Sequence, residues 1–249
     1  MTKYDRAKNI DIFDRDIREH GSYAYTADKL SARLSHQAMN DVVRANYDFK
    51  GRSILDLCCG DGFHTLEFAA LGPARILGLD LAEAAVQKAA ETAAELNLSD
   101  RVHFEVGDVY NLDERLKNQR FDCAMFRACL HHLPDPALAI AKMAPYADSL
   151  IIVEPNGYNP VVKIIEKLSR YHREHDEKSF TLGRIKVWLG QAGFAIRTAT
   201  ICNLVPCFCP DWMAKLLHAL SPAVEAAPLV RALACGQYVI VADRKAAPQ

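Results

Sequence analysis

Four short segments in the middle of the chain carry residues that can bind a polar ligand. The first, SILDLCCGDG at residues 53–62, is an apolar run containing Asp56 that passes into a turn with Gly60 and Gly62. Glycine lets the backbone turn sharply and lets a ligand approach without hindrance from a Cβ atom. Open α/β sheets bind ligands at such strand-to-helix turns. Alone, the turn is also consistent with a simple connection between a strand and a helix.

Two further acids follow apolar runs. Asp80 ends ARILGLD and can accept hydrogen bonds from both hydroxyls of a ribose, or it can cap the helix that follows. Asp108, in FEVGDVYNL, can accept from an exocyclic adenine amine while Val109 packs on the ring. The competing interpretation is that Gly107 and Asp108 only form a turn.

The fourth segment, FDCAMFRACLHHLPDP, places Arg127, Leu130, His131 and His132 just beyond another apolar run. A histidine there can remove a proton from a hydroxyl or an amine at neutral pH. The segment equally fits a loop that packs on a ligand and begins the next helix.

Two more segments contribute candidate polar residues. YHREHDEKSF concentrates titratable groups on a stretch expected to cover the site, with His175 as a candidate base, although such a run is also typical of a solvated helix face. Glu154 and Asn156 come directly after a fifth apolar run, near the expected mouth of the site.

Aromatic residues supply candidate substrate contacts. Tyr23 and Tyr25 precede the first long helix, and Trp212 belongs to an apolar stretch farther on. Packing of a helix against the core accounts for all three residues, and Trp212 can also line an apolar pocket for a substrate.

The eight cysteines divide into two groups. Cys207 and Cys209 form a C-x-C pair with no second cysteine or histidine pair beside it, so no metal site is predicted. Six cysteines lie in or beside apolar runs and are expected to be buried free thiols: Cys58, Cys59, Cys123, Cys129, Cys202 and Cys235.

The elements that must position these residues alternate regularly. One predicted helix carries apolar residues on a single face: Val86, Ala89, Ala90 and Ala93. Short strands joined by helices require a parallel sheet covered on both faces. The fold class is therefore α/β, a doubly wound, mostly parallel sheet. The predicted strands are Ser53 to Cys58, Arg75 to Asp80, Val102 to Val106, Phe121 to Phe126, Leu150 to Glu154, Ala195 to Asn203 and Gln237 to Arg244.

The whole chain, residues 1–249, is expected to be one domain. Thr26 can cap a helix that reaches about Asn46, and another helix is predicted within GRIKVWLGQAGF. The expected parts are an N-terminal helical region (1–50), a core (51–203), insertions covering one end of the sheet (156–182 and 204–235) and a final strand (236–244).

Composition excludes several classes of function. Of 249 residues, 50% are hydrophobic and 24% are charged, which is an ordinary globular balance. A net charge of -1 gives no general case for binding nucleic acid or an anionic membrane. The polar N-terminus lacks a signal core, and no run approaches the length of a membrane span. We therefore expect a cytoplasmic protein.

Taken in order, the segments resemble the class I S-adenosylmethionine-dependent methyltransferases over roughly residues 50 to 195. In that family the glycine turn holds the methionine end of the cofactor, the next acid binds ribose and the third segment contacts adenine. The resemblance implies a Rossmann-like fold with S-adenosyl-L-methionine as cofactor and S-adenosyl-L-homocysteine as product. It implies cofactor-binding roles for Asp56, Cys58, Gly60, Gly62, Asp80, Leu81, Asp108, Val109, Arg127 and Leu130.

The chain departs from the family at Cys58, where glycine is usual. A cysteine side chain is expected to restrict how closely the backbone approaches the cofactor. The main rival cofactor is a nicotinamide dinucleotide, because the same architecture serves dehydrogenases. The first turn lacks G-x-G-x-x-G and the chain lacks a Y-x-x-x-K pair, which favours the methyltransferase.

The sequence thus predicts an enzyme that transfers a methyl group to oxygen or nitrogen of a small-molecule acceptor. The alternative is a non-catalytic S-adenosylmethionine-binding or regulatory protein of the same fold. No nucleic acid or membrane partner is predicted, and the oligomeric state is left open. The catalytic candidates are His131, His132 and His175, and the substrate-binding candidates are Tyr23, Tyr25, Glu154, Asn156 and Trp212. The roles of Tyr23 and Tyr25 are implied by the resemblance, because related enzymes use this N-terminal region (1–50) as a helical lid over the cofactor or the acceptor.

Overall fold

The computed structural model describes residues 6–23, 28–117, 119–169 and 177–245. A seven-stranded sheet in the order β3-β2-β1-β4-β5-β7-β6 forms its centre. The first five strands run parallel, and β7 is antiparallel to both β5 and β6. The strands are β1 (Ser53–Leu57), β2 (Arg75–Asp80), β3 (Val102–Val106), β4 (Phe121–Arg127), β5 (Ala147–Pro155), β6 (Phe194–Cys202) and β7 (Gln237–Arg244).

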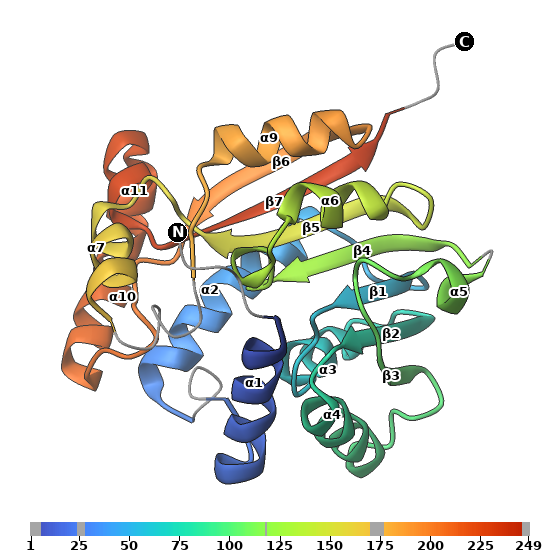
Figure 1. Cartoon of the computed structure of the whole chain (residues 1–249). Coiled ribbons are helices and arrows are strands. Elements are labelled where there is room, and N and C mark those ends of the chain that lie inside the picture. The colour runs from blue at the N-terminus through green and yellow to red at the C-terminus, as the bar shows by residue number, and fades with distance from the viewer. Residues whose placement is uncertain (1–5, 24–27, 118, 170–176, 246–249) are drawn as a thin grey trace.

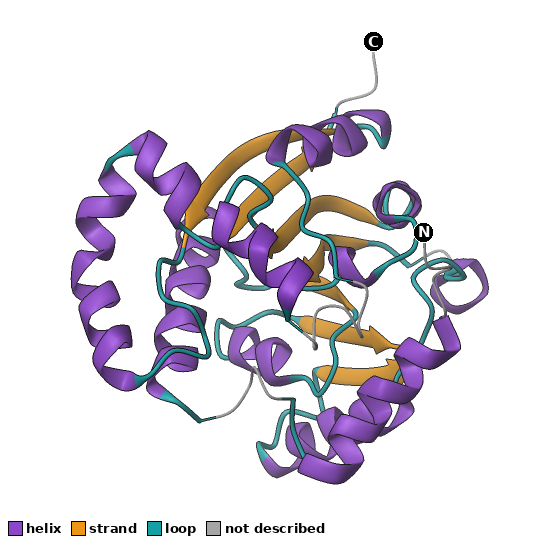
Figure 2. Ribbon diagram, turned by 60° about the vertical axis from the view of Figure 1, so that its left-hand side comes forward, coloured by secondary structure: helices purple, strands orange, loops and turns teal. Residues whose placement is uncertain are grey.

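Helices cover both faces of the sheet, as Figure 2 shows. Apolar residues of α2, α3 and α4 pack on one face, and those of α5, α6 and α9 pack on the other. The helices are α1 (Arg6–His20), α2 (Leu30–Asn46), α3 (Phe63–Ala69), α4 (Glu83–Glu95), α5 (Asp113–Leu116), α6 (Pro136–Lys142), α7 (Pro160–Leu168), α9 (Leu182–Gln191), α10 (Asp211–Ala226) and α11 (Pro228–Ala234), with a 3-10 turn, η2, at Leu130–His132.

The central strands are buried on both faces because helices cover both. In β4 every residue is buried except Asp122, whose carboxylate accepts hydrogen bonds from the backbone N–H and the hydroxyl of Ser53 on β1. A parallel sheet with two covered faces needs such nearly continuous apolar strands. Because β1 to β4 run parallel, their carboxyl ends lie at the same edge of the sheet.

The predicted doubly wound sheet is confirmed. The last strand has the predicted bounds, whereas β1 ends at Leu57 and β5 begins three residues early at Ala147. The long N-terminal helix begins at Leu30, and its predicted cap, Thr26, lies outside the described residues. On α4 the predicted face is shifted, since Ala85 is buried and Ala90 is exposed.

The segments predicted as insertions carry α7, α10 and α11, which gather at the end of the molecule away from α4 (Figure 1). Within the described ranges, none of the helices combines the length and the apolar character needed to cross a membrane. At the other end, α1 lies against α4, where the Asp14 carboxylate accepts a hydrogen bond from the backbone N–H of Ala84 at 2.9 Å.

Candidate active site

The turn after β1 has an unusual backbone. Cys58, Gly60 and Gly62 have φ angles of 57°, 55° and 74°, in the left-handed region that favours glycine. A Cβ atom on Gly60 would lie 2.9 Å from the ring of Tyr23, so glycine is needed for the close approach as well. Cys58 therefore keeps the backbone conformation of the glycine that the resemblance predicts there.

Asp80, at the end of β2, is tied to this turn. Its Oδ2 accepts a hydrogen bond from the backbone N–H of Gly60, and its Oδ1 accepts one from Ala82, both at 2.9 Å. Burial raises the pKa of Asp80, although the backbone N–H donors lower it in part. Ala82 directly precedes α4, so the Asp80 carboxylate stabilises the start of that helix as well as the turn after β1.

Asp108 and Val109 follow β3 at the same edge. The Asp108 carboxylate accepts from the backbone N–H of Tyr110 at 3.0 Å and from Nδ2 of Asn111 at 2.6 Å. Asp108 thus stabilises its own turn, and it also lines the cavity described next. The two interpretations of Asp108 are therefore compatible.

These segments surround one pocket with about 890 Å³ of empty space, open to solvent. Concave pockets with mostly apolar walls and a few polar groups commonly bind small molecules and cofactors. The lining residues are Ile10, Phe13, Tyr23, Leu57, Cys58, Gly60, Leu79, Asp80, Leu81, Ala82, Gly107, Asp108, Val109, Tyr110, Ala128, Cys129, His132, Leu133 and Pro134.

Several other predicted site residues that the structure describes do not line this pocket. Gly62 begins α3, where a Cβ atom would lie 2.7 Å from Cβ of Ala89. Leu130 is fully buried in the core cluster. Trp212 is 69% exposed on α10 and does not line the pocket. Tyr25 and His175 lie outside the described residues.

Asp56 and Arg127 form a polar layer beneath the turn. The Asp56 carboxylate accepts a hydrogen bond from the Thr65 hydroxyl at 2.5 Å, and burial raises its pKa to about 6 against the opposing effect of that bond. Arg127 donates to Oδ1 of Asn40 on α2, whose Nδ2 donates to Glu67 at 2.7 Å. In the structure both residues hold elements together under the pocket.

Cys58 and Cys129 are joined by a disulfide, with Cα atoms 5.9 Å apart. The prediction of free thiols is therefore wrong for these two residues. Cys58 follows β1 and Cys129 follows β4, and these two strands are neighbours in the sheet although 71 residues separate the cysteines. The other four apolar-run cysteines are free, as predicted; Cys123, Cys202 and Cys235 are also buried, whereas Cys59 is only partly buried.

Glu154 organises the turn that carries the two histidines. It is fully buried at the end of β5, and its Oε1 accepts from the backbone N–H groups of Cys129 and Leu130, both at 2.8 Å. Its Oε2 lies 2.7 Å from Nδ1 of His131. Burial lowers the pKa of His131, but the carboxylates of Glu154, Glu177 and Glu166 together raise it by more, so this pKa lies above its ordinary value.

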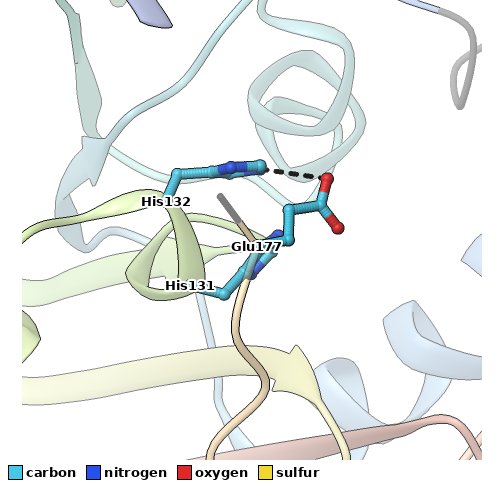
Figure 3. Close-up of side chains that lie close together, drawn as sticks. All are labelled: His131, His132 and Glu177. Atoms are coloured by element: carbon cyan, nitrogen blue, oxygen red, sulfur yellow. Dashed lines mark ion pairs between the residues drawn. The ribbon is translucent and has the colours of Figure 1, made fainter. Parts of the chain in front are cut away.

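His132 lies on the pocket side of this turn. Its ring packs edge-on against Phe13 of α1, with centroids 5.2 Å apart. Its Nε2 lies 4.0 Å from Oε1 of Glu177, so the carboxylate adjoins both imidazoles, as Figure 3 shows. Asn156, by contrast, is buried and donates to backbone oxygens of Ala232 and Cys235 at 2.8 and 2.9 Å, which ties β5 to α11.

Sequence reasoning predicted a helical region at the N-terminus but singled out no residue of α1. Ile10 and Phe13 line the pocket, and Ile17 packs with Tyr23 against the start of α4. The spacing of Ile10, Phe13 and Ile17 along a helix face is a signal that could have found them. Tyr110 also lines the pocket, directly after the predicted Val109.

Comparison with known proteins identifies the family. A family model for a methyltransferase domain matches residues 48–188, which is more than half of the chain. The ubiquinone biosynthesis O-methyltransferase of Neisseria meningitidis serogroup C is 28% identical over 149 residues, covering 56% of this chain and 62% of that protein. Ajmaline N-methyltransferase of Rauvolfia serpentina is 29% identical over 153 residues, covering 57% and 52%. The chain thus spans between 52% and 62% of the length of these relatives.

Solved structures share the fold at low identity. Magnesium protoporphyrin IX methyltransferase (ChlM) from Synechocystis PCC 6803, solved with S-adenosylhomocysteine, has a TM-score of 0.68 at 18% identity, covering 97% of this chain and 100% of that one. The cyclase SpnF has a TM-score of 0.64 at 21% identity, covering 91% and 86%. With the match to the family model, the sheet order and the pocket at its carboxyl edge, this chain belongs to the methyltransferase-domain family and has the fold of the class I S-adenosylmethionine-dependent methyltransferases.

Proposed function

We propose that this protein binds S-adenosylmethionine in the pocket at the carboxyl edge of β1 to β4 and transfers its methyl group to oxygen or nitrogen of a small molecule. One observation carries the proposal. The glycine turn, Asp80 and Asp108 come from three different strand ends and line a single cavity. Each is ambiguous by itself, whereas their convergence matches the parts of this cofactor in order.

The residues present fit the cofactor chemically. The Asp80 carboxylate has acceptor capacity for ribose hydroxyls in addition to its two backbone bonds, since each carboxylate oxygen can accept more than one hydrogen bond. Asp108 can accept from the adenine amine, while the apolar side chains of Leu81 and Val109 provide surfaces for the nucleoside. The turn at Gly60 would place the methionine end near Cys58 and Cys129, which also line the pocket.

The bound cofactor supplies a sulfonium methyl group, whose carbon bonds to the acceptor's lone pair as its bond to sulfur breaks and that electron pair stays on sulfur. The protein's task is to hold the acceptor in line and to exclude water. Phe13 and Tyr23 from the N-terminal region cover the pocket beside His132. We infer that this region is the lid and that His132 receives the acceptor's proton where no other group activates the acceptor.

The class of acceptor rests on the relatives, which include both O- and N-methyltransferases by name. Among the predicted substrate-binding residues, Tyr23 lines the pocket, whereas Glu154 and Asn156 bind neighbouring protein groups. Direct acceptor contacts by Tyr25, Trp212 and His175 stay predictions.

Calorimetric titration with S-adenosylhomocysteine tests the cofactor part. We expect one molecule bound per chain and a loss of at least about tenfold in affinity for Asp80→Asn, since about 1.4 kcal/mol of ribose binding corresponds to that factor. Asp100→Asn, at an exposed position before β3, is the matched control and is expected to bind as the wild type does. Tighter binding of a nicotinamide dinucleotide, or equal affinity in the two variants, would refute the proposal.

A second candidate is a protein that binds the cofactor without methyl transfer. It is favoured by the likeness in fold to SpnF, which is named as a cyclase. A fold alone does not determine an activity. Screening phenols, amines and carboxylic acids for release of S-adenosylhomocysteine separates the two candidates, because only a methyltransferase forms that product.

A further inference from the structure

The two histidines of η2 form a cluster with Glu177 that the proposed methyl transfer does not explain. Across the described ranges of the chain, His131, His132 and Glu177 are the one group of three potential metal ligands, and one ligand atom from each lies within 4.8 Å of the others. Figure 3 shows the Glu177 side chain reaching from its own segment to the two rings. Two imidazoles and one carboxylate are ligands typical of first-row divalent metals.

We propose that His131, His132 and Glu177 bind a divalent first-row cation, with Zn²⁺ as the best match, at the wall of the cofactor pocket. The ion would lower the pKa of a bound acceptor hydroxyl, so that its proton leaves to water and its oxygen takes the methyl group, with His132 acting as a ligand and not as the base. This inference rests on the proposed function and deepens it, because it limits the acceptors to molecules that can ligate a metal. It also departs from the sequence, which predicted no metal site.

The surroundings of His131 support ligation. Because Glu154 lies 2.7 Å from Nδ1 of His131, the neutral ring donates its proton there and presents Nε2 for binding. Metal-binding histidines usually have such a carboxylate behind them, which sets the tautomer and the ring orientation. Glu154 is fully buried and is itself held by two backbone N–H groups, so this support is rigid.

The spacing also suits an ion better than a direct hydrogen bond. Nε2 of His132 and Oε1 of Glu177 are 4.0 Å apart, which exceeds hydrogen-bonding distance. Metal bonds of about 2.1 Å place ligand atoms roughly 3 to 4 Å apart. The cluster therefore needs only a small side-chain rotation to close on an ion. The side chains of His132 and Glu177 are 18% and 10% exposed, so an ion would be largely shielded from water.

Charge favours a cation at this place. The Glu154 carboxylate adjoins His131 and the Glu177 carboxylate adjoins His132, so two acidic groups lie beside the rings. A bound divalent ion would place positive charge next to both carboxylates. Three protein ligands leave at least one position open, which is the arrangement of catalytic rather than structural metal sites. His132 lines the pocket, so the open position is close to the acceptor's expected place.

The test uses the full chain, freed of metal with a chelator and titrated with Zn²⁺ in a calorimeter. The background carries Cys207→Ser and Cys209→Ser, because this free C-x-C pair is the obvious alternative zinc ligand. We expect one ion per chain, at least tenfold weaker binding in Glu177→Gln, and about 10- to 100-fold weaker binding in Glu154→Gln. Glu114→Gln and His218→Gln, both exposed, are controls that are expected to leave affinity unchanged.

Co²⁺ provides a second readout, since its visible absorption bands report coordination by nitrogen and oxygen ligands and should be lost in His132→Gln. Urea unfolding of each variant shows that the fold is intact. The proposal is overturned if the protein in the double-serine background binds no ion while still binding S-adenosylhomocysteine, or if Glu177→Gln and His132→Gln bind Zn²⁺ as tightly as their parent. Either result would leave the proposed cofactor site unaffected, because that site does not depend on the metal.

Discussion

At the scale of single residues, Cys58 shows how a side chain can replace the glycine of a ligand-binding turn. Its φ of 57° keeps the left-handed conformation, which costs a residue other than glycine about 1–2 kcal/mol. Its sulfur bonds to Cys129, which follows the neighbouring strand and also lines the pocket. The disulfide thus connects two strand ends that hold the proposed cofactor site.

The disulfide predicts how many thiols react in the unfolded protein. Of the eight cysteines, six are free, so unfolded and unreduced protein should show six reactive thiols and fully reduced protein eight. Cys58→Ser should raise the unreduced count to seven because Cys129 loses its partner, while Cys207→Ser should lower it to five. Reduction should also lower the free energy of unfolding by about 2–4 kcal/mol. Eight thiols in unreduced wild type would contradict the linkage.

His36 predicts how stability depends on pH. Burial lowers the pKa of this residue from 6.5 to about 4, and nearby Arg127 acts in the same direction. As pH falls from about 6.5 to 4, the unfolded chain takes up a proton that folded His36 does not, so the free energy of unfolding falls by up to about 3 kcal/mol from this residue.

Urea unfolding between pH 7 and pH 4.5 measures this effect. His36→Gln should show a smaller loss of stability than the wild type over that interval, since glutamine does not titrate. His218→Gln, on the exposed side of α10, is the control and should follow the wild-type curve. Parallel curves for all three proteins would rule out His36 as a source of the acid sensitivity.

At the scale of elements, strand ends and helix starts position the site. The η2 turn sits where it does because Glu154 of β5 accepts the backbone N–H groups of Cys129 and Leu130. Asp80 similarly holds the turn after β1 through Gly60. Each connection joins strands that are neighbours or near neighbours in the sheet, so the pocket depends on correct strand order.

The start of α3 gives a prediction with an internal control. Gly62 has a φ of 74°, and an added Cβ would lie 2.7 Å from Cβ of Ala89 and 2.9 Å from the Phe104 ring. Gly62→Ala should therefore lower the free energy of unfolding by more than about 2 kcal/mol. Gly190 in α9 has open space around it, so Gly190→Ala should be neutral or stabilising by up to about 1 kcal/mol. Thermal and urea unfolding would detect the contrast, and equal effects would contradict it.

At the scale of the whole molecule, local patterns predicted the sheet well because buried parallel strands are nearly continuous apolar runs. The bounds of β2, β3 and β7 agree with the prediction. Contacts between distant segments were less predictable. Neither the bond between Cys58 and Cys129 nor the approach of Glu177 to His132 has a signal in local sequence, because each depends on how the strands and insertions come together.

The same distinction between local sequence patterns and contacts of distant segments explains where the site residues lie. Gly60, Asp80 and Asp108 line the pocket because their positions depend only on where strands end. Asp56 and Arg127 turn into the polar layer below, which depends on the packing of α2 and α3. Phe13 reaches the pocket because α1 docks beside it.

The central claim is that the pocket at the carboxyl edge of β1 to β4 holds the methyl donor. A crystal structure of the protein grown with S-adenosylhomocysteine tests this most directly. We predict density for the ligand with its ribose hydroxyls hydrogen-bonded to Asp80, its adenine beside Asp108 and Val109, and its sulfur facing the η2 turn. Density for the ligand elsewhere in the molecule, or in this pocket with the adenine at the η2 turn, would contradict the account.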